Sequence, residues 1–375
     1  MPKRAELIVR GILTTIYRNG LDLSDIQLMP DTVPFIRGFV APNVDVNAFY
    51  PISNVGAVTE NDIKEFLFEY INDTQAATLL QEKQLSFRME LRDTQNNVLG
   101  AFRVTAYYQK EKISLALRIL KTKIPTPEQL HLPPLIQSYI RNNNYGLVMV
   151  TGSTGSGKTT TAVALLKDKL LHHKNHGVLH LVTIESPIEY EFLVKPTEGI
   201  VEQREVGIDT PSYPAATRDV VRINPNIIFV GEVRDPVTAE NCLQMATTGH
   251  LVVTTFHASS VVEAIARFRS MLPSQEDVSM FSSSLIAVTN QHLNTFKGTT
   301  QSYVFPVVEA LYNEESIREL IISDRLIEAK NYMRSSEKCL TAEKSEAYIR
   351  QLIDEMEEKE LIRKPQPPPI PPTTT

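Results

Sequence analysis

One stretch of the sequence combines the residue types and the spacing needed to hold a chain of phosphates. Residues 152–159 read Gly-Ser-Thr-Gly-Ser-Gly-Lys-Thr and fit the pattern G-x-x-x-x-G-K-S/T. Glycines let successive backbone N–H groups turn toward phosphate oxygens, and the start of the following helix adds the positive end of its dipole. Lys158 is expected to reach the β and γ phosphates, and Thr159 to hold Mg²⁺.

The flanks of this stretch support the same interpretation. An apolar, strand-like run precedes it and a helix-forming run follows it, so a turn that binds nothing is the less favoured alternative. We name residues 152–159 the phosphate loop. The predicted nucleotide-binding residues are Gly152, Ser153, Thr154, Gly155, Ser156, Gly157, Lys158, Thr159 and Thr160.

Acidic side chains follow two other apolar runs. Ile227–Val230 is followed by Gly-Glu, so the carboxylate of Glu232 is expected at the end of a buried strand, as in a Walker B element. Glu185 and Glu189 follow a second such run. Ligands of an α/β sheet lie outside the carboxyl ends of its strands, so these three acids could converge on the phosphate loop. The alternative is that they are separate surface acids.

Histidines and arginines supply further candidates. His250 and His257 bracket the run Leu251–Phe256, whose extended length of about 23 Å prevents them from sharing one metal or one substrate atom. We expect one near the nucleotide and the other at a subunit interface, while a structural role is an equal alternative for either alone. Arginines neutralise charge on the γ-phosphate, often from a neighbouring subunit. The candidates are Arg103, Arg118, Arg204, Arg218, Arg222 and Arg234.

The elements that must position these residues fall into two parts. Strict alternation over residues 85–92, followed by strand-like runs at 99–108 and 113–120, predicts an antiparallel meander. A proline-containing linker follows, and beyond it apolar runs alternate with helical patterns, which is typical of a RecA-like α/β core. We predict an N-terminal α+β domain (1–122), a linker (123–134), an ATPase domain with C-terminal helices (135–364) and a disordered proline-rich tail (365–375).

Composition limits the function further. The 375 residues carry a net charge of −6, which argues against nucleic acid as the main partner because such binding depends on clustered Lys and Arg. The two cysteines, Cys242 and Cys339, lie far apart and suit a reducing cytosol. The four histidines between residues 172 and 180 are interpreted as solvated surface. We find no transmembrane segment in the sequence and expect any membrane role to be exerted through a partner.

With these residues assembled, the sequence resembles the secretion and type IV pilus ATPases, most closely their PilT-like retraction branch. Residues 23–38 and 101–109 are similar to the family's PAS-like N-terminal domain, and the phosphate loop is its Walker A motif. TIESPIEY (183–190) matches the Asp box, RDVVRINPNIIFVGEVRD (218–235) matches the run through Walker B, and TGHLVVTTFHA (248–258) matches the His box.

The resemblance implies a homo-hexameric ring in which N-terminal PAS-like domains move against RecA-like cores as ATP is bound with Mg²⁺ and hydrolysed. It implies a cytoplasmic protein, peripheral to the inner membrane, that acts on a platform protein of a pilus or secretion machine. It also assigns roles, namely metal and water acids to Glu189 and Glu232, a γ-phosphate sensor to His257 and arginine fingers to Arg103 and Arg118.

Two alternatives remain beside the retraction motor. Ser186 stands where pilus members usually carry Asp, and Glu185–Glu189 is similar to the ATPase of Dot/Icm-type (DotB-like) type IVB secretion and conjugation systems. Residues 316–321 instead resemble the short C-terminal helix motif of retraction ATPases. The other alternative is a nucleotide-gated scaffold without productive turnover, although both Glu189 and Glu232 are present.

Overall fold

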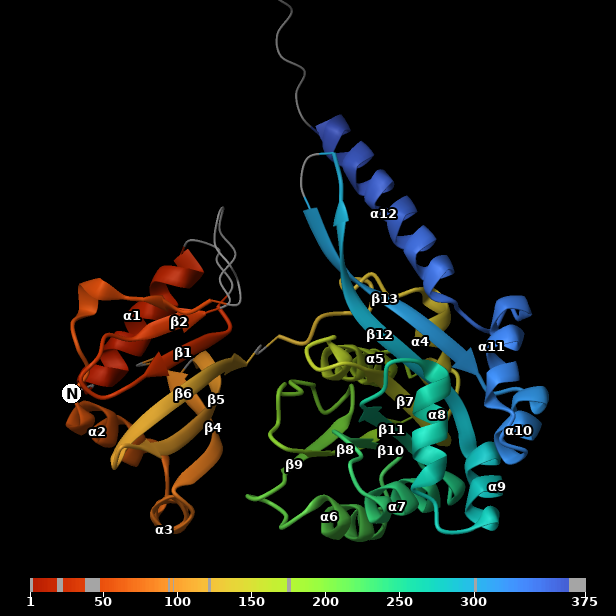
Figure 1. The fold of residues 1–375 in the computed structure, drawn as a ribbon, viewed down its shortest axis with the longest axis horizontal. Coiled ribbons are helices and arrows are strands. Elements are labelled where there is room, and N and C mark those ends of the chain that lie inside the picture. The colour runs from red at the N-terminus through yellow and green to blue at the C-terminus, as the bar shows by residue number, and fades with distance from the viewer. Residues whose placement is uncertain are drawn as a thin grey trace, which may run out of the picture. The chain divides into compact units, whose positions relative to one another are not determined.

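The structure is a computed structural model that describes residues 3–18, 23–37, 48–93, 95–96, 98–120, 123–173, 177–299 and 302–363 (Figure 1). These residues divide into two compact units between Lys123 and Ile124, and the short segment Pro187–Glu191 belongs to the first unit. The predicted tail at 365–375 lies outside the described residues.

The first unit is an antiparallel sheet covered by helices. Its helices are α1 (Arg4–Arg18), α2 (Glu60–Tyr70) and α3 (Asp73–Glu82), with a 3-10 turn η1 (Ser53–Val55). Its strands are β1 (Asp25–Leu28), β2 (Phe35–Arg37), β3 (Tyr50–Pro51), β4 (Gln84–Arg92), β5 (Val98–Gln109) and β6 (Lys112–Leu120). The strand order is β3-β2-β1-β6-β5-β4. The predicted meander is therefore confirmed as β4, β5 and β6.

Local chemistry explains how the helices of this unit begin. The Thr59 side chain accepts from the Asp62 backbone N–H while the Asp62 carboxylate accepts from that of Thr59, which forms a capping box at α2. Asn72 and Gln75 do the same at α3. Successive strand residues point to opposite faces of the sheet. Apolar side chains of β4, β5 and β6 consequently pack with α1 and α2 in one core, and the alternate residues lie on the other face.

The second unit is built on a mostly parallel sheet. Its strands are β7 (Gly146–Gly152), β8 (His180–Glu185), β9 (Ile200–Glu205), β10 (Ile227–Val230), β11 (Leu251–Phe256), β12 (Leu285–Lys297) and β13 (Ser302–Tyr312). They lie in the order β13-β12-β7-β11-β10-β8-β9, and β13 alone among these runs antiparallel to its neighbour. The α/β fold class with a RecA-like core and an N-terminal domain is thus confirmed.

Helices flank this sheet. They are α4 (Pro134–Arg141), α5 (Lys158–Leu171), α6 (Tyr213–Val220), α7 (Pro236–Thr247), α8 (Val261–Ser270), α9 (Gln275–Ser284), α10 (Glu315–Ile322), α11 (Leu326–Ser335) and α12 (Ala342–Arg363), with a 3-10 turn η2 (Val221–Ile223). The strands β7, β10 and β11 are buried along their whole length, as expected for a sheet covered on both faces.

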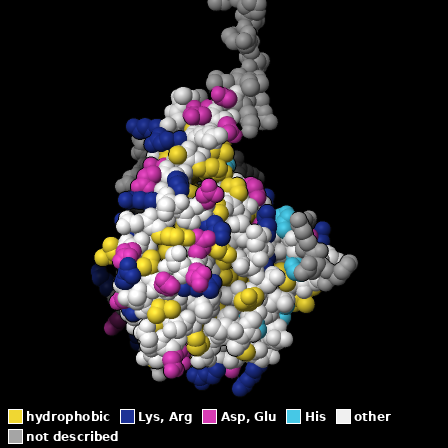
Figure 2. All heavy atoms as spheres, turned by 90° about the vertical axis from the view of Figure 1, so that its right-hand side faces the viewer, with side chains coloured by type: hydrophobic (Ala, Val, Ile, Leu, Met, Phe, Trp, Pro, Cys, Tyr) yellow, Lys and Arg dark blue, Asp and Glu magenta, His cyan; other side chains and the backbone are white. Residues whose placement is uncertain are grey.

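The outer end of the β12–β13 pair packs against α12 (Figure 1). Phe296 and Phe305 of the strands and Ile349 and Ile353 of the helix share one small apolar core. The apolar stripe of this charged helix therefore serves packing. Within the described part of the chain, no helix is both long and apolar enough to cross a membrane. On the face of the second unit seen in Figure 2, basic and acidic side chains are interspersed.

Candidate nucleotide site

The phosphate loop connects β7 to α5. Gly155 and Gly157 have φ angles of +77° and +84°, in the left-handed region that glycine tolerates without strain. Lys158 is buried, with 8% of its surface exposed, and its Nζ donates to the Ser153 carbonyl oxygen at 2.7 Å. The ammonium group thus lies against the loop. The sequence pattern has produced the strand, glycine turn and helix that phosphate binding requires.

Sheet order brings other predicted residues to the same edge. β11 lies between β7 and β10 with Phe256 paired to Thr151, so His257 and Gly152 leave neighbouring strands at the same end. β10 is the next strand, and Glu232 follows it. His257 Nε2 lies 3.1 Å from Glu232 Oε1. The structure therefore brings together a histidine and an acid that are 25 residues apart in the sequence, beside the phosphate loop.

Charges around Glu232 shape the electrostatics of this edge. Arg234 places a terminal nitrogen 2.5 Å from Glu232 Oε2. Burial, together with the positive charge of Lys158, lowers the pKa of His257 even though Glu232 opposes that shift. The imidazole is consequently neutral at pH 7, with both a donor and an acceptor nitrogen.

Glu185 occupies a different environment at the end of β8. Its side chain is 2% exposed and accepts hydrogen bonds from Thr183 Oγ1 at 2.6 Å and Gln203 Nε2 at 3.3 Å. Burial, followed by the negative charges of Glu185 and Glu232, raises the pKa of the Tyr213 hydroxyl. Glu185 and Glu232 thus share one neighbourhood, whereas the convergence of all three acids on the phosphate loop stays a prediction.

Other candidates lie elsewhere. Glu189 is in the segment Pro187–Glu191 of the first unit, and its role stays a prediction. His250 is 6% exposed at the opposite end of β11, where its Nδ1 is 2.7 Å from the Pro225 carbonyl oxygen, so its role is structural. His172 and His180 pair with carboxylates. His176 lies outside the described residues.

The predicted arginine fingers lie on the first unit. Arg103 of β5 and Arg118 of β6 are directly paired across the strands, on the face opposite the helices. Arg118 donates from Nε to Asp25 Oδ1 at 3.1 Å, whereas the described residues offer Arg103 no ion pair. In the second unit, Arg234 contacts Glu232, and Arg222 is a surface charge near Asp219.

Sequence reasoning missed two amides at the end of β12. Asn290 donates to Thr151 Oγ1 and to the Ala258 carbonyl oxygen, both at 2.9 Å, and so connects the residue before the phosphate loop to the residue after His257. Gln291 donates to the Ser156 carbonyl oxygen at 2.7 Å. A signal was present, because both amides follow the apolar run Leu285–Val288 as Glu232 follows Ile227–Val230.

Comparisons with known proteins agree with this geometry. The sequence pattern of the family described as "Type II/IV secretion system protein" matches residues 43–364. YggR of Escherichia coli is 35% identical over 263 residues, which cover 69% of this chain and 76% of that protein. The type IV pilus retraction ATPase PilT of Pseudomonas aeruginosa is 32% identical over 306 residues, covering 81% and 82%.

Solved structures give the same result. The crystal structure of the pilus retraction motor PilT with bound ADP aligns with a TM-score of 0.74 at 29% identity, over 90% of this chain and 96% of that one. The ATPase DotB of Legionella pneumophila aligns with a TM-score of 0.68 at 22% identity, over 95% and 90%, and this likeness supports the fold alone. The chain therefore belongs to the type II/IV secretion system protein family and is a nucleotide-binding, PilT-like ATP hydrolase.

Proposed function

We propose that this ATPase works as a hexameric motor that powers type IV pilus retraction, or a related secretion machine, at the cytoplasmic face of the inner membrane. The observation that carries the proposal is the cluster of Lys158, His257 and Glu232 at the carboxyl edge of the parallel sheet. Similarity to proteins named as a pilus retraction ATPase, a pilus retraction motor and a twitching motility protein supports the mechanical role.

The chemistry of the edge fits Mg²⁺. Mg²⁺ prefers hard oxygen ligands and usually binds through one or two carboxylates together with substrate phosphates. Thr159, in the first turn of α5, supplies a hydroxyl, and Glu232 supplies a carboxylate after the end of β10. These two residues would hold the ion, which would supply positive charge to the phosphates, and the metal role of Glu189 stays a prediction of the sequence.

The residues of the proposed site then have the following roles. Backbone N–H groups of the phosphate loop and the Lys158 ammonium bind the phosphates. Glu232 accepts a hydrogen bond from the attacking water and orients it, while the neutral His257 turns its one N–H from Glu232 to the γ-phosphate. Arg103 and Arg118 approach the phosphates from a neighbouring subunit of the ring, where their charge offsets that developing on the γ-phosphate.

The site assignment is tested by two substitutions. Glu232→Gln should lower steady-state ATP hydrolysis by about 100-fold or more while ADP still binds, because Gln cannot accept a proton or offset the positive charges nearby. Lys158→Ala should abolish ADP binding in calorimetric titration. Glu240→Gln in α7 is the matched control and should hydrolyse ATP like the wild type. Near wild-type turnover in Glu232→Gln or Lys158→Ala would reject the site.

A DotB-like role in type IVB secretion is the second candidate, and Ser186 beside the buried Glu185 favours it. The two machines differ in what they move. Deleting the gene should abolish surface twitching if the motor retracts a pilus. Loss of conjugative transfer with intact twitching would favour the second candidate.

A further inference from the structure

The glutamine that ends the buried part of β12 contacts the phosphate loop directly. Gln291 is paired with Gly152 in the parallel register of β12 and β7, and 1% of its surface is exposed. Its Nε2 donates to the Ser156 carbonyl oxygen at 2.7 Å. We propose that Gln291 is a positioning residue that holds the phosphate loop in the conformation that receives the nucleotide. This inference rests on the proposed role of the loop.

The hydrogen bond from Gln291 to the Ser156 carbonyl also fixes the direction of the next backbone N–H, that of Gly157. A peptide unit is planar and trans, so the carbonyl of Ser156 and the N–H of Gly157 point in opposite directions. Because Gln291 draws the carbonyl toward β12, the N–H of Gly157 is directed away from β12, to the side of the loop where phosphates bind. Rotation of this peptide would instead turn a carbonyl oxygen toward the phosphates, and like partial charges would repel.

Such a rotation is accessible to the loop because glycines surround the peptide. Gly157 has a φ of +84° and Gly155 one of +77°, and both residues can adopt several backbone conformations at little cost. Contact with β12 limits that freedom. A Cβ built on Gly152 would lie 2.3 Å from the Gln291 carbonyl oxygen, and one on Gly157 would lie 3.4 Å from Gln291 Nε2. The loop therefore rests on Gln291 at two points.

Two buried polar atoms without partners show that this arrangement lowers the stability of the fold. Gln291 Oε1 and Ser156 Oγ are buried and have no hydrogen-bond partner in the described structure. A buried polar atom without a partner lowers stability, and an apolar side chain of similar size at this position would avoid the loss at Oε1. The amide thus supplies something that packing alone does not, namely a donor for the Ser156 carbonyl.

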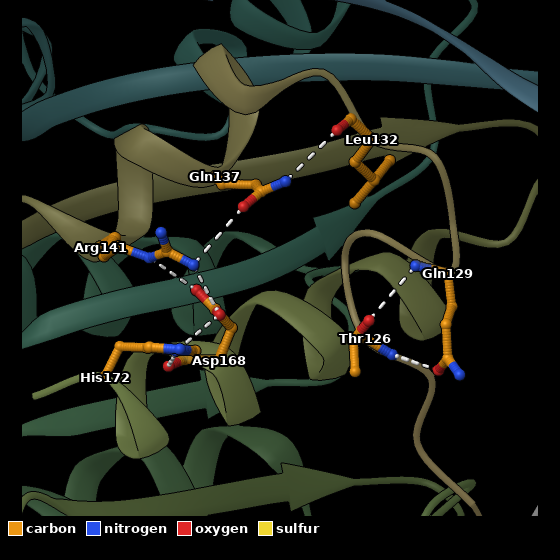
Figure 3. Close-up of polar contacts among 7 residues, drawn as sticks. All are labelled: Thr126, Gln129, Leu132, Gln137, Arg141, Asp168 and His172. Carbon is orange, nitrogen blue, oxygen red and sulfur yellow. Dashed lines mark hydrogen bonds and ion pairs between the residues drawn. The ribbon is translucent and has the colours of Figure 1, made fainter. Parts of the chain in front are cut away.

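The test compares two glutamines in the same unit. Gln137 of α4 is 8% exposed and also donates from Nε2 to a backbone carbonyl, that of Leu132 at 3.3 Å (Figure 3). Methionine keeps the length of glutamine and removes the donor. Gln291→Met and Gln137→Met are therefore matched variants, one at the phosphate loop and one away from it.

The measurements are calorimetric titration of the full chain with ADP and the KM for ATP. Gln291→Met should weaken ADP binding and raise KM by about tenfold, because the loop must be reordered before each nucleotide binds. Gln137→Met should stay within about twofold of the wild type in both. Without nucleotide, Gln291→Met should lower the melting temperature no more than Gln137→Met does, because methionine removes the unpartnered Oε1 of Gln291, whereas Gln137→Met also loses the contact of its Oε1 with Arg141. A larger effect of Gln291→Met on ADP binding then separates loop positioning from a general loss of stability.

Gln291→Glu provides a second, independent variant. An ionised carboxylate has the same shape but cannot donate to the Ser156 carbonyl, so ADP binding should weaken at least as much as in Gln291→Met. If Gln291→Met does not fold, the ADP affinity of Gln291→Glu tests the inference instead. ADP affinity within about twofold of wild type in a folded Gln291 variant would overturn the inference. Loss of ADP binding in Lys158→Ala alongside that result would reject the role of Gln291 while leaving the proposed site intact.

Discussion

At the scale of single residues, the two histidines of the His box show that position decides chemistry. His257 leaves β11 at the carboxyl end, beside Glu232 and within the field of Lys158. His250 precedes the same strand and is buried against the Pro225 carbonyl. One imidazole therefore lies at the proposed nucleotide site, and the other connects the loop before β11 to the loop before β10.

Alanine substitutions should separate these two roles. His257→Ala should lower kcat by about 100-fold, because a donor directed at the transferred phosphate is lost. His250→Ala should leave kcat unchanged and lower the free energy of unfolding by about 1 to 3 kcal/mol, since the buried Pro225 carbonyl loses its partner. Steady-state kinetics and calorimetric melting of both variants provide the measurement. Equal loss of kcat in the two variants would contradict the assignment.

At the scale of elements, close contact between strands fixes the start of the phosphate loop. Gly152 has a φ of +147°, and a side chain there would collide with the backbone of β12 at Gln291. Gly155 has open space around its Cα, so a methyl group meets no neighbour within 4 Å. The two glycines of one motif thus serve different purposes, close packing and backbone freedom.

Gly152→Ala should therefore be far more harmful than Gly155→Ala. The first forces the strands apart and should lower the free energy of unfolding by about 3 kcal/mol. The second adds only the left-handed backbone strain of a non-glycine residue, about 1 to 2 kcal/mol. Calorimetric melting of the two variants tests the difference. A larger loss in Gly155→Ala than in Gly152→Ala would show that the contact with β12 does not constrain the loop.

The sheet of the first unit carries a row of charges in register. Arg37, Asp25, Arg118, Arg103 and Arg88 lie opposite one another across β2, β1, β6, β5 and β4. Like charges directly opposite each other are destabilising. Asp25 offsets part of this repulsion, since it lies 2.9 Å from a terminal nitrogen of Arg37 and 3.1 Å from Nε of Arg118.

Asp25→Asn should lower the melting temperature of the full chain and make its stability less sensitive to acid. Burial acts to raise the pKa of Asp25, but the hydrogen bond from Ser24, the charge of Arg118 and the hydrogen bonds from Arg118 and Arg37 together lower it below its ordinary value of 3.8. A lowered pKa stabilises the fold above the unfolded value, and this contribution is lost as pH falls through the folded value.

The expected difference from wild type is about 1 to 2 kcal/mol at pH 7. It should begin to shrink below about pH 4, where the carboxyl of the unfolded wild type takes up a proton, and vanish once the folded carboxyl is protonated too. Calorimetric melting from neutral to acid pH measures this change. A difference that stays constant across that range would show that Asp25 does not stabilise the row through its charge.

At the scale of the whole molecule, the phosphate loop and the predicted arginine fingers belong to different compact units. Lys158, Glu232 and His257 lie in the unit that begins at Ile124, whereas Arg103 and Arg118 lie in the unit that ends at Lys123. In the proposed ring, an arginine of one subunit serves the nucleotide of the next. Hydrolysis would then depend on assembly.

Mixing two inactive variants tests this dependence. Arg118→Ala should lower kcat by about 1000-fold, and Lys158→Ala should not bind ATP. In mixed rings, a Lys158→Ala subunit still offers Arg118 to a neighbour whose phosphate loop is intact, so some activity should return. Arg222→Ala, at a surface charge of the second unit, is the control and should turn over normally. Mixtures as inactive as either variant alone would argue against action between subunits.

The sequence alone determined the phosphate loop, the buried strands β10 and β11 and the meander of the first unit. These features depend on contacts between near neighbours in the chain, namely glycine spacing, apolar runs and strict alternation. The α/β class and the acid after Walker B followed from them, since a strand end in a parallel sheet faces the ligand.

Only the tertiary structure decided which strand ends meet. The order β12-β7-β11-β10 places Gln291, the phosphate loop, His257 and Glu232 at one edge of the sheet, although these residues are spread over positions 152 to 291 of the sequence. It also separated His250 from the site and revealed the row of charges around Asp25. Strand order and register arise from packing between distant segments, so a local sequence pattern does not predict them.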